Sequence, residues 1–247
     1  MTVDVCAVYS YTKQKTNESK LGAACPDGPE GIQFQPRTNN RGKGVLHMKK
    51  IVSFALLVCL MLTMTSLATA EISGDPLVPV KGPIMITNAG QGPGGKMGRL
   101  LVSRTGTLVE EQDYYYVDVP YAADVDALPY GAILIVIGST DKGLGATGIT
   151  IDQEIARVNE VMARAKEVGI PVIAALLEKD KRSEIPTNAN ERCIDAVCPF
   201  ASWMIVVADA NTDGRFDKLK EEYGIPLTIL GSSMDFIELA KQTFCNE

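Results

Sequence analysis

The sequence predicts an α/β domain, a three-layer αβα sandwich in which helices cover both faces of a mostly parallel sheet of five to six strands. Short apolar runs alternate with helical patterns between residues 84 and 244, as in βαβ units with right-handed crossovers. Residues 132–138 form an unbroken apolar run, which is typical of a strand buried on both faces of a parallel sheet.

Each element has its own local signal. Thr150 and Gln153 form a capping box, the helix that follows repeats its apolar residues at spacings of three and four, and Gly169 ends it. The expected strands are 84–88, 115–119, 132–138, 171–177, 203–208 and 225–230. The expected helices are 97–104, 150–168, 190–197, a helix that follows the turn 209–214, and 234–244, with one helical turn at 124–128. We expect residues 139–148 to form a long glycine-rich loop.

The N-terminal part of the chain has the pattern of a secretory signal peptide over residues 48–70. Met48 begins a short positive region, residues 51–67 are apolar and uncharged, and Ala-Thr-Ala at 68–70 fits a cleavage site. This predicts Sec-type export to the periplasm, cell envelope or extracellular space, without stable membrane insertion after cleavage. Residues 1–47 are then an upstream gene-model artefact or a disordered extension. Residues 71–83 are expected to be a linker, and 84–247 a single αβα domain.

Composition excludes several kinds of function. Residues 71–247 contain 16 Lys and Arg against 26 Asp and Glu, a net charge of −10, which argues against nucleic acid and anionic membranes as partners. The only histidine, His47, precedes this region. Ser-His-Asp and Cys-His catalysis and histidine-bound zinc are therefore not expected.

Two glycine-rich segments follow the first and third expected strands. If the strand order is 2-1-3-4-5, as in a flavodoxin-like or Rossmann-like sheet, these strands are neighbours at the switch point where such sheets bind ligands. The sequence therefore predicts a small polar or anionic ligand between residues 90–98 and 139–150, with Lys96 as its charge partner. The expected ligand-binding residues are Asn88, Gly90, Gln91, Gly92, Gly95, Lys96, Ser139, Thr140, Lys142, Gly143 and Gly145.

Residues 90–96 match two nucleotide motifs imperfectly. Their Gly-x-Gly-x-x-Gly spacing fits a dinucleotide fingerprint, with Asp113 or Asp118 as the ribose acid. Their Gly-x-x-x-x-Gly-Lys spacing fits a phosphate loop, but Met97 stands where Ser or Thr would hold Mg²⁺. The alternative is a glycine-rich turn that packs the first helix against the sheet.

A third segment resembles a calcium loop. Asp209, Asn211, Asp213 and Asp217 place oxygens at positions 1, 3, 5 and 9, but Lys220 stands where the closing Glu should be. The sequence therefore suggests Ca²⁺ as a cofactor, against the alternative of an Asn/Asp/Gly turn. The charged run 179–184 is expected to be a solvated loop, whose cations could also reach the switch point.

Three cysteines lie beyond the expected cleavage site. In an oxidising compartment we expect a disulfide, either Cys193–Cys198 or Cys198–Cys245, and the alternative is three inert thiols.

Several segments resemble an exported bacterial family of unknown function with a flavodoxin-like sheet. They are Thr-Asn-Ala-Gly-Gln-Gly at 87–92, Lys-Gly-Leu-Gly-Ala-Thr-Gly-Ile at 142–149, Glu-Ile-Ala-Arg at 154–157 and Asn-Thr-Asp-Gly-Arg-Phe at 211–216. The resemblance covers residues 84–230 and implies no catalytic residue. The chain departs from the family at 90–94, where relatives have Gly-Gln-Ser-Pro-Asp. It also departs at 177–182, where relatives have a His-Gly-Gly-Arg-Arg-like run.

These observations favour an exported binding protein. The alternatives are a histidine-free, metal-assisted enzyme that works through Asp209 and Asp213, and an envelope interaction module without a small-molecule site.

Overall fold

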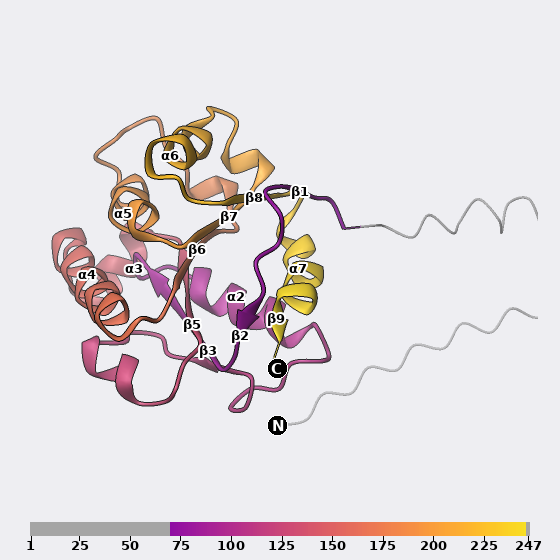
Figure 1. The fold of residues 1–247 in the computed structure, drawn as a ribbon. Helices are drawn as coiled ribbons and strands as arrows, with labels where there is room; N and C mark the ends of the chain where they lie inside the picture. Colours follow the sequence, from indigo (N-terminus) through magenta and orange to yellow (C-terminus); the bar gives the residue numbers. More distant parts are fainter. Residues whose placement is uncertain (1–69, 246–247) are drawn as a thin grey trace, which may run out of the picture. The chain divides into compact units, whose positions relative to one another are not determined.

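The computed structural model describes residues 70–245, which lie in one compact unit, Leu67–Glu247 (Figure 1). Residues 1–47 and nearly all of the expected signal peptide, 48–70, lie outside the described residues. Within them, every helix is too short or too polar to cross a membrane.

The centre of this unit is a seven-stranded sheet in the order β1-β8-β7-β6-β5-β3-β4. All neighbouring strands run parallel except β1 and β8. From β4 to β8 the order is that of a 2-1-3-4-5 sheet with one further strand, so the α/β fold class and the strand order are confirmed. The strands are β1 (Ile72–Gly74), β3 (Ile84–Ala89), β4 (Tyr114–Tyr116), β5 (Ala132–Ile137), β6 (Val172–Leu176), β7 (Trp203–Val207) and β8 (Leu227–Leu230).

The expected linker, 71–83, is instead part of the fold. β1 adds an antiparallel edge strand in which Ile72 is opposite Leu230, so the sheet has seven strands rather than five or six. β2 (Val80–Lys81) pairs in parallel with β9 (Phe244–Cys245) in a second, two-stranded sheet. Both pairings join segments more than 150 residues apart, and such partners leave no local periodicity in the sequence.

Helices cover both faces of the sheet, as expected. α2 (Gly94–Ser103) and α7 (Phe236–Thr243) pack together on one face. α4 (Ile151–Val168), α5 (Ala189–Val197) and α6 (Arg215–Tyr223) lie on the other (Figure 1). Short 3₁₀ turns are η1 (Ala122–Asp126), η2 (Lys179–Lys181), η3 (Cys198–Phe200), η4 (Ala208–Ala210) and η5 (Ser233–Asp235).

The predicted ends of α4 are confirmed in detail. The Thr150 hydroxyl oxygen accepts the Gln153 N–H at 3.2 Å, and the Gln153 side-chain oxygen accepts the Thr150 N–H at 2.8 Å. Gly169 follows the helix with φ +79°, a left-handed conformation that glycine adopts without steric cost. α4 therefore begins and ends where its sequence signals indicate.

The segment 139–148 is not the loop that its glycines suggested. It contains a two-turn helix, α3 (Asp141–Thr147). The Thr140 hydroxyl oxygen accepts the Gly143 N–H and caps the first turn, while Leu144 is the buried residue of the helix. One capping hydrogen bond and one buried apolar side chain thus stabilise this helix, although its two glycines, Gly143 and Gly145, have low helix propensity.

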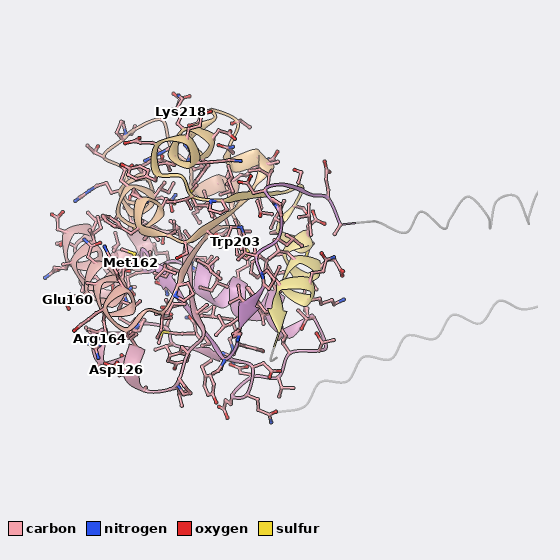
Figure 2. All side chains as sticks on the ribbon, viewed as in Figure 1. Asp126, Glu160, Met162, Arg164, Trp203 and Lys218 are labelled. Atoms are coloured by element: carbon pink, nitrogen blue, oxygen red, sulfur yellow. The ribbon has the colours of Figure 1, made fainter. Side chains whose placement is uncertain are left out.

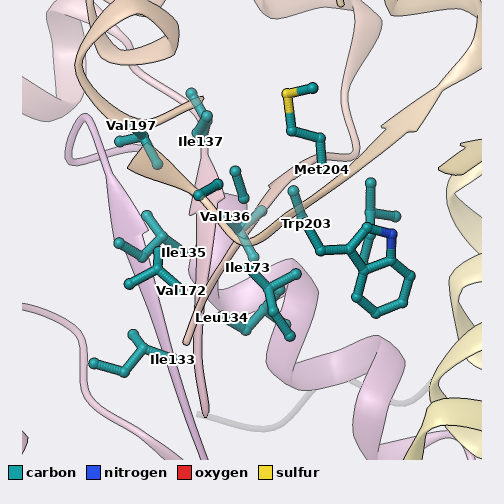
Figure 3. Packing of buried hydrophobic residues seen from close by; sticks show 14 of the residues in the cluster. Ile133, Leu134, Ile135, Val136, Ile137, Val172, Ile173, Val197, Trp203 and Met204 are labelled. Carbon is teal, nitrogen blue, oxygen red and sulfur yellow. The ribbon is translucent and has the colours of Figure 1, made fainter. Parts of the chain in front are cut away.

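The core fixes the strand ends from which the site is built. Every residue of β3, β5, β6 and β7 is buried, and Figure 3 labels side chains of β5, β6 and β7 within this core, among them Ile135, Ile173 and Trp203. The Trp203 indole N–H donates to the Thr228 hydroxyl at 2.9 Å. Because these strands are fixed on both faces, the loops at their carboxyl ends have fixed starting points.

Candidate functional site

The two glycine-rich segments leave the carboxyl ends of neighbouring strands, as the strand order requires. Ala89 at the end of β3 is in register with Ile137 at the end of β5. Gly90, with φ +107°, turns the chain out of β3 toward α2. Ser139 and Thr140 connect β5 to α3.

These segments are in direct contact with each other. Gln91 and Ser139 form an antiparallel bridge. A Cβ atom on Gly92 would lie 1.9 Å from the Gly138 carbonyl oxygen, and one on Gly143 would lie 2.0 Å from the Gln91 oxygen. The missing Cβ atoms thus allow close backbone packing. At these points the space that the sequence suggested for a ligand is filled by the chain itself.

A buried carboxylate occupies the anion position of the first turn. The Gly90 N–H donates to Glu154 Oε1 at 2.8 Å, and Gln91 Nε2 donates to Glu154 Oε2 at 2.8 Å. Glu154 lies on α4 and has no exposed surface. A phosphate could reach the Gly90 N–H only by displacing this carboxylate, so the geometry argues against the nucleotide motifs.

Arg157 neutralises the charge of Glu154 and also hydrogen-bonds two backbone carbonyl oxygens. Its Nε and Nη2 donate to the two Glu154 oxygens at 2.9 and 2.7 Å. Its remaining contacts are to the carbonyl oxygens of Pro120, at 2.8 Å, and Asn88, at 3.2 Å. Four of the five guanidinium N–H groups thus have an acceptor, and a buried ion pair bonded in this way holds its neighbours in one arrangement. Here the pair ties α4 to the segments that follow β3 and β4.

Lys96 does not face the second glycine-rich segment. Its ammonium lies 3.7 Å from Asp118 Oδ2, and both side chains are more than half exposed. Gly95 lets α2 approach β3, because a Cβ there would lie 3.1 Å from the Asn88 Cβ. Lys142 is exposed on α3, and a Cβ on Gly145 would meet nothing within 4 Å.

Asn88 is buried at the end of β3 with one unsatisfied atom. Its Nδ2 donates to the Asp118 carbonyl at 3.0 Å and to the Asp118 carboxylate at 3.1 Å. These two acceptors fix the orientation of the amide, so Asn88 Oδ1 is left without a partner among residues 70–245. Tyr116 also donates to Asp118, at 2.6 Å. Burial, followed by this carboxylate, raises the pKa of Tyr116.

A second set of unsatisfied polar atoms lies at the carboxyl ends of β5 and β6. Asn190, in the first turn of α5, accepts the Ser139 N–H through Oδ1 at 3.0 Å. Asn190 Nδ2 therefore points elsewhere. Asn190 Nδ2, Ser139 Oγ and Glu178 Oε2 are each buried without a hydrogen-bond partner in the described part of the chain. Lys181 is 3.9 Å from Glu178 Oε2, an ion pair too long for a hydrogen bond.

Glu178 lies beside Gly138, the residue before Ser139. It follows β6, and its Oε2 is 3.7 Å from the position that a Cβ on Gly138 would take. We call Ser139, Glu178 and Asn190 the carboxyl-edge cluster. It offers one amide donor, one carboxylate acceptor and one hydroxyl that can do either.

The suggested calcium loop is held by protein side chains instead. Asp209 pairs with Lys179 at 3.0 Å, and Asp213 with Arg182 at 2.6 Å. The remaining two residues bond each other, Asn211 Nδ2 donating to Asp217 at 2.7 Å. No group of three or more His, Cys, Asp or Glu within residues 70–245 could hold a metal ion. These four side chains thus bond other protein groups, which fits the turn alternative, and Ca²⁺ binding stays a prediction.

The predicted disulfide is absent. Cys193 and Cys198 are both free and buried, which also rules out the Cys198–Cys245 alternative. Burial raises the pKa of each thiol to about 12, so the reactive thiolate is scarce at neutral pH. The alternative of inert thiols holds for this pair.

Comparison with known proteins gives the family. A family model described as a domain of unknown function, DUF6305, matches residues 81–244. The chain belongs to this family. The DUF6305 match confirms the resemblance to a family of unknown function, whereas export and a bacterial source stay predictions. None of the curated proteins compared with the chain matches it.

Among solved structures, the chain is similar to a GDP-L-fucose synthetase from Naegleria fowleri bound to NADP. The sequence identity is 12%, the TM-score is 0.33, and the match covers 57% of this chain and 54% of that one. The chain thus spans about half the length of that enzyme. A likeness this weak carries no argument about ligands.

The DUF6305 region contains residues that sequence reasoning missed. Glu178 and Asn190 were not expected to contribute to a site, and Glu154 and Arg157 stood out only as part of the resemblance. Two signals point to the first pair: Glu178 lies just beyond a buried strand, and Asn190 lies in the first turn of a helix, after its cap Asn188. No local pattern shows that Glu154 meets Gly90.

Proposed function

We propose that this chain is an exported binding protein for a small, uncharged polar ligand held by the carboxyl-edge cluster. One observation supports this most. Each of the four buried side-chain atoms without a partner in the described residues belongs to a residue at or just beyond a strand end, or in the first turn of a helix, at the same edge of the sheet. Buried polar groups are nearly always satisfied, and this edge is where sheets of this class bind ligands.

The chemistry of the cluster favours hydroxyl or amide groups. Asn190 Nδ2 needs an acceptor, Glu178 Oε2 needs a donor, and Ser139 Oγ can bond either. A polyol, a sugar or a primary amide supplies both kinds of group, whereas a phosphate or carboxylate would face Glu178 with like charge. The glycine-turn donors are also already bonded to Glu154. The ligand is therefore better described as polar and uncharged than as anionic.

Access requires a small movement of the protein, because the three atoms are covered. α3 begins two residues after Ser139 and is anchored by one buried residue, Leu144. Its glycines lower its intrinsic stability by about 1 kcal/mol each relative to alanine. α3 is therefore the segment near Ser139 that opens at the lowest cost.

Export is argued from residues 48–70 alone. The positive, apolar and small-residue regions follow one another in the order of a signal peptide. N-terminal sequencing of the protein recovered outside the cytoplasm should begin at Glu71. Recovery of a chain that still carries residues 48–70 would contradict the proposal.

Binding can be tested with a ligand screen and one small substitution. Thermal shift and NMR should detect neutral polyols, sugars or amides, and not inorganic phosphate or acetate. Ser139→Ala should weaken a hit, because it removes one of the three contacting groups and keeps the Ser139 backbone bond to Asn190. Ser103→Ala is the control, since that exposed hydroxyl bonds its own helix at Leu100.

Two results of the screen would oppose the proposal. One is a screen in which phosphate or a nucleotide binds and no neutral compound does. The other is a neutral hit whose affinity is the same in the Ser139→Ala and Ser103→Ala variants. A buried water in a high-resolution crystal structure, bridging the cluster unchanged in the presence of every hit, would also contradict it.

A further inference from the structure

An apolar groove lies at the opposite edge of the sheet from the carboxyl-edge cluster. It has a volume of about 730 Å³ and runs between the end of α4, the start of β6 and η3, with Met162, Val172 and Phe200 in its walls. This volume lies within the usual range of small-molecule sites, about 300–1,000 Å³.

A second hollow of about 440 Å³ adjoins this groove. Gly169, Ile170, Pro171 and Ser202 line both. The second hollow continues past Trp203 toward β2 and Tyr130. Met162 on α4 and Trp203 in β7, both labelled in Figure 2, belong to the first and the second hollow respectively. Together the hollows suit an elongated molecule better than a compact one.

The charge of these walls contrasts with the rest of the protein. Residues 71–247 carry a net charge of −10, yet no Asp or Glu lines either hollow. Each has one lysine, Lys166 in the first and Lys81 in the second. Both lysines are exposed, and neither has an ion partner among residues 70–245. The lining of each hollow therefore offers an anion one lysine and no carboxylate, while Glu222 bonds the Tyr223 hydroxyl beside the first hollow.

Aromatic side chains mark the rim. Phe200 is 67% exposed and Tyr223 is 46% exposed, and both line the first hollow. Large apolar side chains left in water beside an apolar groove indicate a surface that is covered when something binds.

We propose that the groove binds a small anionic amphiphile, an unbranched aliphatic chain with a carboxylate headgroup. The chain would lie along the walls at Met162, Ile170 and Phe200, and the headgroup would pair with Lys166. The proposal does not depend on the carboxyl-edge cluster, which lies at the other edge of the sheet.

Calorimetric titration with decanoate, decanol and decylammonium tests the headgroup, with each compound kept below its micelle concentration. Decanoate should bind one to one and decanol more weakly, while decylammonium should not bind. Nonanoate should bind about fourfold more weakly than decanoate, which is the effect of one buried methylene. Equal affinity for decylammonium and decanoate, or no dependence on chain length, would overturn the proposal.

Four variants locate the site. Lys166→Gln should weaken decanoate by up to about fivefold, as expected for an exposed ion pair, and leave decanol unchanged. Lys218→Gln is its control, because Lys218 is exposed on α6 away from both hollows (Figure 2). Ala163→Phe adds bulk to the wall of the groove and should abolish binding. Ala156→Phe, exposed on the same helix outside both linings, should not.

The alternative occupant is a second copy of this chain. If sedimentation shows a dimer that Ala163→Phe disrupts, and decanoate does not bind, the groove is an interface between two copies of the chain and the amphiphile proposal is wrong. Ser139→Ala should leave decanoate binding unchanged, so a failure at this groove is distinguishable from a failure at the carboxyl edge.

Discussion

Replacing Glu154 with alanine should convert the closed glycine-rich turn into an open anion site. In the native chain the Glu154 carboxylate accepts the Gly90 N–H, the Gln91 amide and two Arg157 N–H groups. The substitution leaves a buried guanidinium beside a backbone N–H with no acceptor. The vacated space matches the carboxylate that was removed.

The cost should be large because Glu154 has no exposed surface and Arg157 is only 7% exposed. Removing one partner of a buried ion pair costs about 3–5 kcal/mol, against a total unfolding free energy of about 5–15 kcal/mol for ordinary domains. Glu160→Ala on the same helix is the matched control, since Glu160 is exposed (Figure 2). It should change stability by less than about 0.5 kcal/mol.

Formate should rescue the variant. A ligand that binds only the folded state stabilises it by about 1.4 kcal/mol at ten times its Kd. Urea unfolding of wild type, Glu154→Ala and Glu160→Ala, in sodium formate and in sodium chloride of equal ionic strength, separates this effect from screening. Only Glu154→Ala should gain stability from formate. If it does not fold, Glu154→Gln and the double variant Glu154→Leu/Arg157→Met replace it, and the double variant should be the more stable of the two.

Two results would refute the reasoning. One is a loss below about 1 kcal/mol for Glu154→Ala, the scale of an exposed pair. The other is the same response to formate in Glu154→Ala and Glu160→Ala.

Four further predictions concern buried or paired groups. Ser139→Ala should leave the ligand-free protein as stable as wild type or up to about 1 kcal/mol more stable, because the lost hydroxyl has no partner among the described residues. Thr228→Val should cost about 1–3 kcal/mol of stability, because the Trp203 indole N–H loses its acceptor. Chemical unfolding measures both effects. Cys193 should not react with iodoacetamide at pH 8 while the protein is folded, since burial raises its pKa to about 12; mass spectrometry showing labelling at the rate of a free thiol would contradict this. The hydrogen bond from Arg182 lowers the pKa of Asp213. The stability that this hydrogen bond contributes is therefore present above about pH 4 and is lost as the pH falls further. Asp213→Asn should therefore flatten the acid side of the stability curve, as measured by urea unfolding at a series of pH values.

Local signals in the sequence account for most of the architecture. The apolar run at 132–138 and the capping box at Thr150 each depend on neighbouring residues, and both were interpreted correctly. The strand order 2-1-3-4-5 was assumed for a sheet of this class, and the structure has it from β4 to β7. The edge strand β1 was missed because its partner, β8, lies more than 150 residues away. α3 was missed because Gly143 and Gly145 argue locally for a loop, while its Thr140 cap and Leu144 anchor depend on the fold.

The site was harder to predict for the same reason. The glycines at 90 and 92 suggested a ligand cradle, but their neighbours are the Glu154 carboxylate, 64 residues on, and the backbone of Gly138. Sequence alone cannot distinguish a glycine that admits a phosphate from one that admits another part of the chain. The cysteine spacing likewise gave no distance between the two sulfur atoms. What the sequence did indicate was the edge of the sheet, because that depends only on strand order.

The most direct test of the binding proposal is an NMR titration that observes the Asn190 side-chain NH₂ and the Ser139 backbone amide. We expect a neutral polyol, sugar or amide to shift both signals together, with one-to-one saturation, in wild type and not in Ser139→Ala. Signals that stay fixed for every neutral compound, or that move only with phosphate, would contradict the account.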